Sequence, residues 1–151
     1  MHAHRLDAYK IAPAGMTALR GVEAYLHQST LGPQLIELVK MRASQTNGCA
    51  YCLDMHSKVL RQGGESEQRL YLLSGWRESP LYSPRERAAL AWTDALTLIA
   101  ETQAPDAVYD ELCRHFDDKE VVDLTTLVGM INLWNRLAIS LRYEHPVSAA
   151  A

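Results

Sequence analysis

The amino-acid sequence predicts an all-α fold, a single-domain helical bundle with about six to eight helices. Apolar residues recur at helical spacing along most of the chain, and two stretches carry the capping boxes that begin helices. We find no run of alternating apolar and polar residues, the pattern of a half-buried strand. At 151 residues the chain is long enough to bury a sizeable core in one domain.

Glycines, prolines and capping residues divide the chain into segments. We expect an extended N-terminal arm over residues 1–12, a helical domain over residues 13–145 and a flexible tail over residues 146–151. Within the domain, helices are expected over about 16–27, 33 to the turn at 47–48, 47 or 48 to 62, 66–73, 83–100, 105–116 and 118–143.

The clearest helix starts precede the two longest predicted helices. Ser83 with Glu86, and Asp117 with Glu120, have the spacing of a capping box, in which each end satisfies a backbone N–H of the other. The helix that follows Asp117 is apolar on most sides, and such a helix needs burial on most sides. We therefore expect it to be a central helix, a subunit interface, or both.

The overall composition excludes several classes of protein. Apolar residues make up 48% of the chain and charged residues 22%, which is typical of a globular protein rather than a disordered one. A net charge of -3 gives no electrostatic footprint for nucleic acid or an anionic membrane. No apolar run approaches the roughly 20 residues of a membrane span, and the N-terminus lacks the apolar region of a secretory signal. We expect a cytoplasmic protein with neither nucleic acid nor membrane as a partner.

The stretch from Glu37 to His56 combines an acid, two cysteines and a histidine. Cys49 and Cys52 are three positions apart, and His56 follows Cys52 by four. Residues at these spacings share a helix face, with about 5–6 Å between Cβ atoms, so the two thiols can form a disulfide beside the imidazole. The turn at residues 47–48 places the cysteines at a helix start, where unpaired N–H groups favour a thiolate. The preceding helix can fold back and bring the Glu37 carboxylate to the same face.

Three interpretations of the cysteine pair follow from the residues. In a reducing compartment an isolated CxxC pair is more typical of redox or metal chemistry than of a structural staple, and its position beside His56 favours redox or peroxidatic chemistry. Glu37, Cys49, Cys52 and His56 could nominally supply four zinc ligands, but a second ligand pair is missing, so we expect neither metal nor cofactor. Buried inert thiols are the third interpretation. A non-enzymatic redox sensor, or a metal-binding oligomeric interaction protein, is the alternative function.

Other polar side chains are candidates for the wall or support of this site. Tyr51 lies between the two cysteines. Asn132, Asn135 and Arg136 interrupt the apolar last helix, and because buried polar groups need partners we expect them to tie helices together. All three are also candidates for a role in binding a substrate or a subunit.

The motif Glu37, Cys49, Tyr51, Cys52 and His56 resembles the core motif of the alkyl hydroperoxidase D (AhpD)-like family within the carboxymuconolactone decarboxylase superfamily. The resemblance implies an all-helical fold, a homo-oligomer such as a trimer or hexamer, and peroxide reduction by thiols. Cys49 and Cys52 match the redox pair, and Glu37 and His56 match the proton relay. AhpD itself has a histidine where this chain has Tyr51, and decarboxylases of the superfamily lack the CxxC pair. A hydroperoxide substrate and an unidentified dithiol reductant are the implied partners.

The expected reaction is attack of one thiolate on the peroxide, followed by closure of a disulfide with the other thiol. We assign the attack to Cys52, because His56 is its direct helical neighbour and the resemblance points the same way, and the resolving role to Cys49. The helix dipole alone would favour Cys49 as the attacking thiol. His56 and Glu37 would shuttle the proton.

Overall fold

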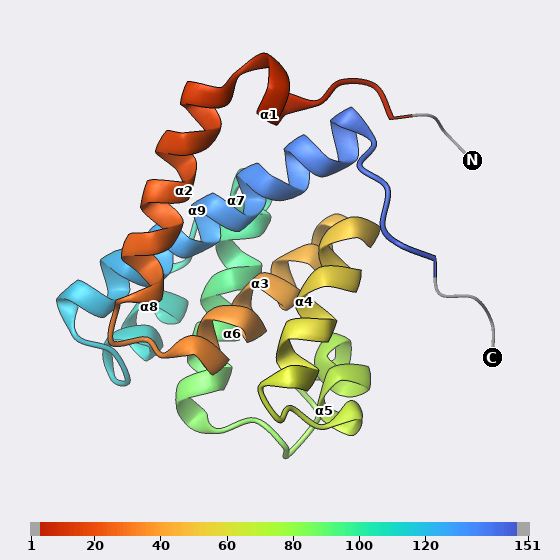
Figure 1. The fold of residues 1–151 in the computed structure, drawn as a ribbon. Helices are drawn as coiled ribbons and strands as arrows, with labels where there is room; N and C mark the ends of the chain where they lie inside the picture. The colour runs from red at the N-terminus through yellow and green to blue at the C-terminus, as the bar shows by residue number, and fades with distance from the viewer. Residues whose placement is uncertain (1–3, 148–151) are drawn as a thin grey trace.

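A computed structural model describes residues 4–147, and all regular secondary structure in this part of the chain is helical (Figure 1). The expected fold class is confirmed. None of the described helices combines the length and hydropathy of a membrane span. The described elements are α1 (Ala8–Ile11), α2 (Pro13–His27), α3 (Pro33–Asn47), α4 (Ala50–Gln62), α5 (Glu67–Leu72), the 3₁₀ helix η1 (Leu73–Gly75), α6 (Pro84–Thr97), α7 (Ile99–Thr102), α8 (Asp106–Cys113) and α9 (Asp118–Leu141).

Two four-residue helices raise the number of helices above the expected range. The segment expected as one helix over residues 83–100 is interrupted at Leu98, which separates α6 from α7. The arm expected to be extended contains α1, because the Asp7 carboxylate caps it by accepting hydrogen bonds from the backbone N–H groups of Tyr9 and Lys10. Of the predicted flexible tail, residues 148–151 lie outside the described residues.

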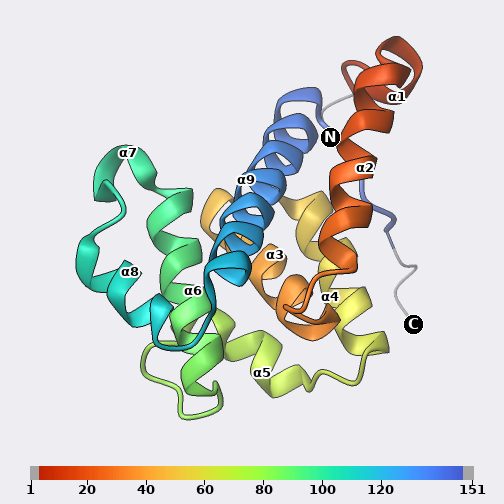
Figure 2. The ribbon, with the colours of Figure 1, turned by 90° about the vertical axis from the view of Figure 1, so that its left-hand side faces the viewer.

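The N-terminal segment lies against the end of the last helix. The backbone N–H of Arg5 donates to the carbonyl of Leu141 at 3.0 Å, and the Arg5 guanidinium donates to the carbonyl of Ser140 at 3.1 Å. α2 then runs back alongside α9, as both ribbon views show (Figure 1, Figure 2). Residues from both ends of the chain therefore meet close to the cysteine pair.

The central helix of the fold is α3, which packs against α4, α6 and α9. Every residue from 35 to 41 is buried, including Glu37 and Lys40. The last helix, α9, buries one broad side, but Val122 and Ile139 remain 63% and 47% exposed. The central position considered for the last helix thus belongs to α3, and the subunit interface expected on α9 stays a prediction.

Hydrophobic clusters on two sides of α3 hold the bundle together. Val39 belongs to the larger cluster, which joins α2, α3, α6, α8 and α9, and Leu38 belongs to a second cluster with α4, α5 and α6. A small third cluster contains Cys49, Cys52 and Ala138. The cysteine pair at the start of α4 thus packs against the C-terminal half of α9.

Candidate active site

A tight turn between α3 and α4 places the cysteine pair. Gly48 ends α3 in the left-handed region, with φ of 70°, a conformation that glycine adopts without steric cost. Cys49 is the N-cap of α4, and its sulfur accepts a hydrogen bond from the backbone N–H of Cys52 at 3.3 Å. α4 therefore begins about two residues later than expected, because Asn47 and Gly48 complete the preceding helix.

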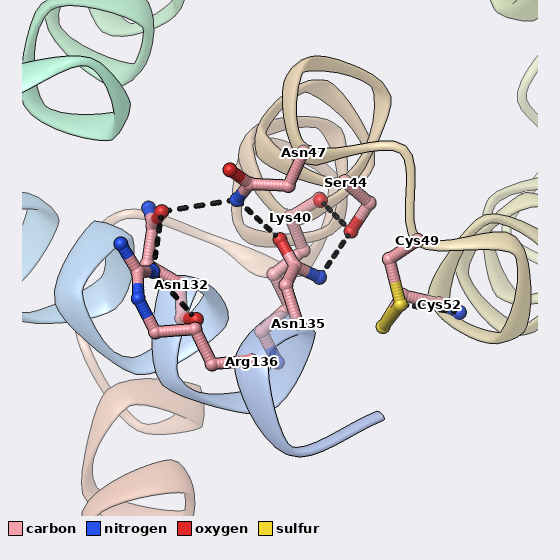
Figure 3. Close-up of a disulfide and its surroundings, with 8 residues drawn as sticks. All are labelled: Lys40, Ser44, Asn47, Cys49, Cys52, Asn132, Asn135 and Arg136. Atoms are coloured by element: carbon pink, nitrogen blue, oxygen red, sulfur yellow. Dashed lines mark hydrogen bonds between the residues drawn. A yellow bond between two sulfur atoms is a disulfide. The ribbon is translucent and has the colours of Figure 1, made fainter. Parts of the chain in front are cut away.

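The two cysteines form a disulfide, as their spacing predicts. Their Cα atoms are 5.3 Å apart, and both residues are almost fully buried. Figure 3 shows the disulfide between the start of α4 and the side chains of α9. Within residues 4–147, no three His, Cys, Asp or Glu side chains are grouped as metal ligands.

His56 and Glu37 are in direct contact. α3 folds back on α4 and so brings the carboxylate to the imidazole, as the sequence analysis considered possible. The Nδ1 atom of His56 lies 2.7 Å from Oε2 of Glu37, and the two side chains are only 6% and 10% exposed. Burial raises the pKa of the Glu37 carboxyl, but the hydrogen bond and charge of His56 and the charge of Lys40 outweigh it, so this pKa lies below its ordinary value. A carboxylate only accepts hydrogen bonds, so Nδ1 donates the proton. In the neutral imidazole, Nε2 is then the free base.

Lys40 and Glu23, which the sequence analysis did not select, extend the pair of His56 and Glu37 to a cluster of four titratable side chains. The Lys40 ammonium donates to Oε2 of Glu23 at 2.7 Å and lies 3.6 Å from Oε1 of Glu37. The indole N–H of Trp134 donates to the other oxygen of Glu23 at 2.8 Å. A lysine three residues after Glu37 in an otherwise apolar run was the one local signal for this cluster.

A pocket of about 170 Å³ opens beside the disulfide and the histidine. Cys52, His56 and Tyr51 all line it, so the predicted wall residue Tyr51 is at the site. Cys49 lines a different hollow, with Gly48 on its rim. The remaining lining residues, which sequence reasoning did not select, are Tyr9, Glu23, Lys40, Met55, Trp134, Ala138 and Tyr143.

Two buried polar atoms of the pocket residues have no hydrogen-bond partner within residues 4–147. They are Nε2 of His56 and the hydroxyl oxygen of Tyr143. Burial raises the pKa of Tyr143, so its phenol keeps its proton and can donate it in a hydrogen bond. An unsatisfied buried polar group costs free energy, so a ligand that bonded to both atoms would be stabilised.

Polar residues of α9 form a network with the end of α3, beside the disulfide (Figure 3). The amide of Asn47 donates to the side-chain oxygens of Asn132 and Asn135 at 3.0 and 2.8 Å, and Asn135 donates to Ser44 at 3.0 Å. Arg136 donates to the backbone carbonyl of Asn132 at 2.9 Å. Asn132 and Asn135 tie helices together, as expected, whereas both hydrogen bonds of Arg136 stay within α9. Neither Asn132 nor Arg136 lines the pocket of Cys52, because both border a separate hollow next to α7.

Substitution of Asn135 by leucine is expected to lower the free energy of unfolding by about 2–3 kcal/mol. The replacement has a similar size but removes two hydrogen bonds between α9 and α3, of which the one to Ser44 is buried. Urea denaturation followed by circular dichroism measures the change. Ser140→Ala, at an exposed position of the same helix, is the control. A loss below about 0.5 kcal/mol, the range of ordinary surface substitutions, would contradict a structural role for the network.

Comparisons of the amino-acid sequence identify a family and a relative of this chain. The model of the carboxymuconolactone decarboxylase family matches residues 12–95, more than half of the chain. The uncharacterized protein YdfG of Bacillus subtilis is 42% identical over 139 residues, which cover 92% of this chain and 95% of YdfG.

Solved structures show the same fold. A protein of unknown function from Agrobacterium tumefaciens, for which a role as the antioxidant defence protein AhpD has been suggested, superposes with a TM-score of 0.93 at 47% identity, covering 97% of this chain and all of that one. An uncharacterized peroxidase-related protein from Silicibacter sp. TM1040 gives a TM-score of 0.80 at 26% identity, covering 91% of this chain and 73% of that one. This chain is an AhpD-like member of the carboxymuconolactone decarboxylase family.

Proposed function

We propose that this protein reduces organic hydroperoxides with electrons from the Cys49–Cys52 pair. The observation that carries the proposal is that Cys52 and His56 line one pocket, while Glu37 holds Nδ1 of His56 and leaves Nε2 free as a base. A thiol beside a positioned base is the arrangement that activates a sulfur nucleophile. The similarity to a suggested AhpD and to a peroxidase-related protein supports the same chemistry.

The reaction balances as a two-electron reduction. His56 accepts the proton of the Cys52 thiol at Nε2, and the thiolate attacks the terminal peroxide oxygen, the one that carries hydrogen, so that an S–O bond forms and the O–O bond breaks. The departing alkoxide takes the proton from His56 and leaves as an alcohol. The Cys49 thiol then displaces hydroxide from the sulfenic acid of Cys52, which gives water and the disulfide. A dithiol reductant, oxidised to its own disulfide, restores both thiols by exchange.

The pocket walls favour a small organic substrate. Tyr51, Met55 and Trp134 offer apolar surface to a hydrocarbon group, and the Tyr143 hydroxyl can donate to a peroxide oxygen. The volume of about 170 Å³ is below the roughly 300 Å³ at which pockets for drug-sized ligands begin. We therefore propose compact alkyl or aryl hydroperoxides rather than long-chain ones.

Titration of the reduced protein with tert-butyl hydroperoxide tests the proposal. The thiol count is expected to fall from three to one per chain with one equivalent of peroxide, because Cys113 lies outside the pair. Dithiothreitol is expected to restore the count and to sustain peroxide consumption. In Cys113→Ser, the count is expected to fall from two to none. Retention of three thiols in the wild-type protein would contradict redox activity, and thiol loss without turnover would favour the redox-sensor alternative.

The assembly and location of the protein stay predictions. A trimer or hexamer is the expected form, and exposed apolar residues such as Ile99, Val122 and Ile139 provide surface that self-association would bury. The expected cytoplasmic location accords with reduction of the pair by a cellular dithiol.

A further inference from the structure

A row of titratable side chains from three helices connects His56 with Glu37, Lys40 and Glu23. His56 on α4 contacts Glu37 on α3, Glu37 is 3.6 Å from Lys40, and Lys40 donates to Glu23 on α2. The Lys40 side chain is only 6% exposed and that of Glu23 only 17%. Charges this poorly solvated interact more strongly than surface pairs, and salt screens them less.

The charges of this row almost balance. Glu23 and Glu37 contribute two negative charges and Lys40 one positive charge, so the row carries one net negative charge while His56 is neutral. When His56 accepts a proton from Cys52, the net charge of the row becomes zero. The ammonium of Lys40 therefore opposes proton binding at His56, whereas the Glu23 carboxylate favours it.

We propose that Lys40 and Glu23 are positioning residues that set the pH range in which Cys52 and His56 lose a proton, with opposite effects. Lys40 holds Glu37 as a carboxylate that fixes Nδ1 of His56, and Glu23 offsets the lysine charge and holds the Trp134 indole against the pocket. The inference rests on the proposed function, since it takes these two side chains as the reacting pair.

The other titratable groups near this row come from α1, α2, α4 and the segment after α9. His27 on α2 lies 3.8 Å from Glu23 and its side chain is 49% exposed, so solvent weakens its influence. Tyr9 on α1, Tyr51 on α4 and Tyr143 after α9 line the pocket as phenols, which are uncharged near neutral pH. Lys40 is therefore the buried cation next to Glu37 in the described part of the chain.

The test measures alkylation of Cys52 by iodoacetamide as a function of pH. Cys49→Ser serves as the background, so that mass spectrometry of the peptide reports Cys52 alone. Lys40→Met is expected to move the acidic limb of the profile to higher pH by about one unit, because removal of a nearby cation makes proton loss harder. Glu23→Gln is expected to move it by a similar amount to lower pH, and the double variant to return close to the background value.

Opposite shifts distinguish an electrostatic role from a loss of packing, which would move both profiles in the same direction or neither. Lys58→Met removes a cation from the exposed face of α4 and is expected to leave the limb within about 0.3 units. If Lys40→Met does not fold, Glu23→Gln, which keeps the size of the side chain, decides by itself. A profile unchanged by Glu23→Gln, or shifted upward by it, would overturn the inference.

Peroxide turnover is measured separately on the same substitutions in the chain that keeps Cys49. Opposite alkylation shifts without turnover in the wild-type protein would leave the inference standing and remove the proposed function. Turnover in the wild-type protein with no alkylation shift in the variants would overturn the inference and leave the function standing.

Discussion

Substitution of Cys52 by serine is expected to abolish hydroperoxide turnover, with a loss on the order of 10³-fold or more, as for removal of an enzymatic nucleophile. A serine hydroxyl is not ionised at neutral pH and cannot supply two electrons to the O–O bond. A coupled assay with tert-butyl hydroperoxide and dithiothreitol measures the loss. Cys113→Ser, which leaves the pair intact, is expected to keep the wild-type rate.

Cys49→Ser separates attack from resolution. This variant is expected to consume one equivalent of peroxide and to leave a sulfenic acid on Cys52, which dimedone labels and mass spectrometry locates. Cys52→Ser is expected to give no label on Cys49, because Cys49 does not line the pocket of His56. Label on Cys49 in Cys52→Ser would exchange the two roles, and full turnover by either variant would contradict the two-cysteine cycle.

Substitution of His56 by alanine is expected to lower turnover by about 10²–10⁴-fold, the usual contribution of a general acid–base residue. Alkylation of Cys52 in the same variant is expected to require higher pH, because the thiol has lost the base that accepts its proton. Glu37→Gln is expected to have a smaller effect of the same kind, since an amide can no longer stabilise the imidazolium by charge.

His115→Ala provides a matched control for His56. His115 also pairs with a glutamate, through a 3.1 Å contact between Nε2 and Glu111, but it is only partly buried and does not line the pocket. Its removal is expected to leave turnover and the alkylation profile unchanged. An unchanged profile in His56→Ala would remove His56 from the proton relay.

Local sequence signals predicted most of the helices. The capping boxes at Ser83 and Asp117 both form, with reciprocal hydrogen bonds to Glu86 and Glu120. These helix starts could be predicted from the sequence because a capping box depends only on two residues three positions apart. The start of α4 was placed too early because a glycine with positive φ can end one helix as readily as it precedes another, and only the backbone angle of Gly48 decides between them.

The candidate site was only partly predictable. Glu37, Cys49, Cys52 and His56 lie within twenty residues, so helical spacing and family resemblance could select them. The partners that complete the pocket come from distant segments: Glu23 precedes Lys40 by 17 positions, and Trp134 is 111 positions from Glu23. Contacts of this range depend on how whole helices pack, and no local pattern in the sequence encodes them.

The connection between α3 and α4 at Gly48 is tight, so the number of residues between Glu37 and the cysteines determines how these side chains face one another. An α-helix turns by about 100° per residue, so one residue inserted into α3 after Glu37, or into α4 before His56, would rotate one of these two side chains by more than a quarter of a circle relative to the other. The imidazole would then point away from its carboxylate partner while each helix stayed intact. The eleven residues between Glu37 and Cys49 therefore keep the carboxylate and the imidazole on facing sides of two packed helices.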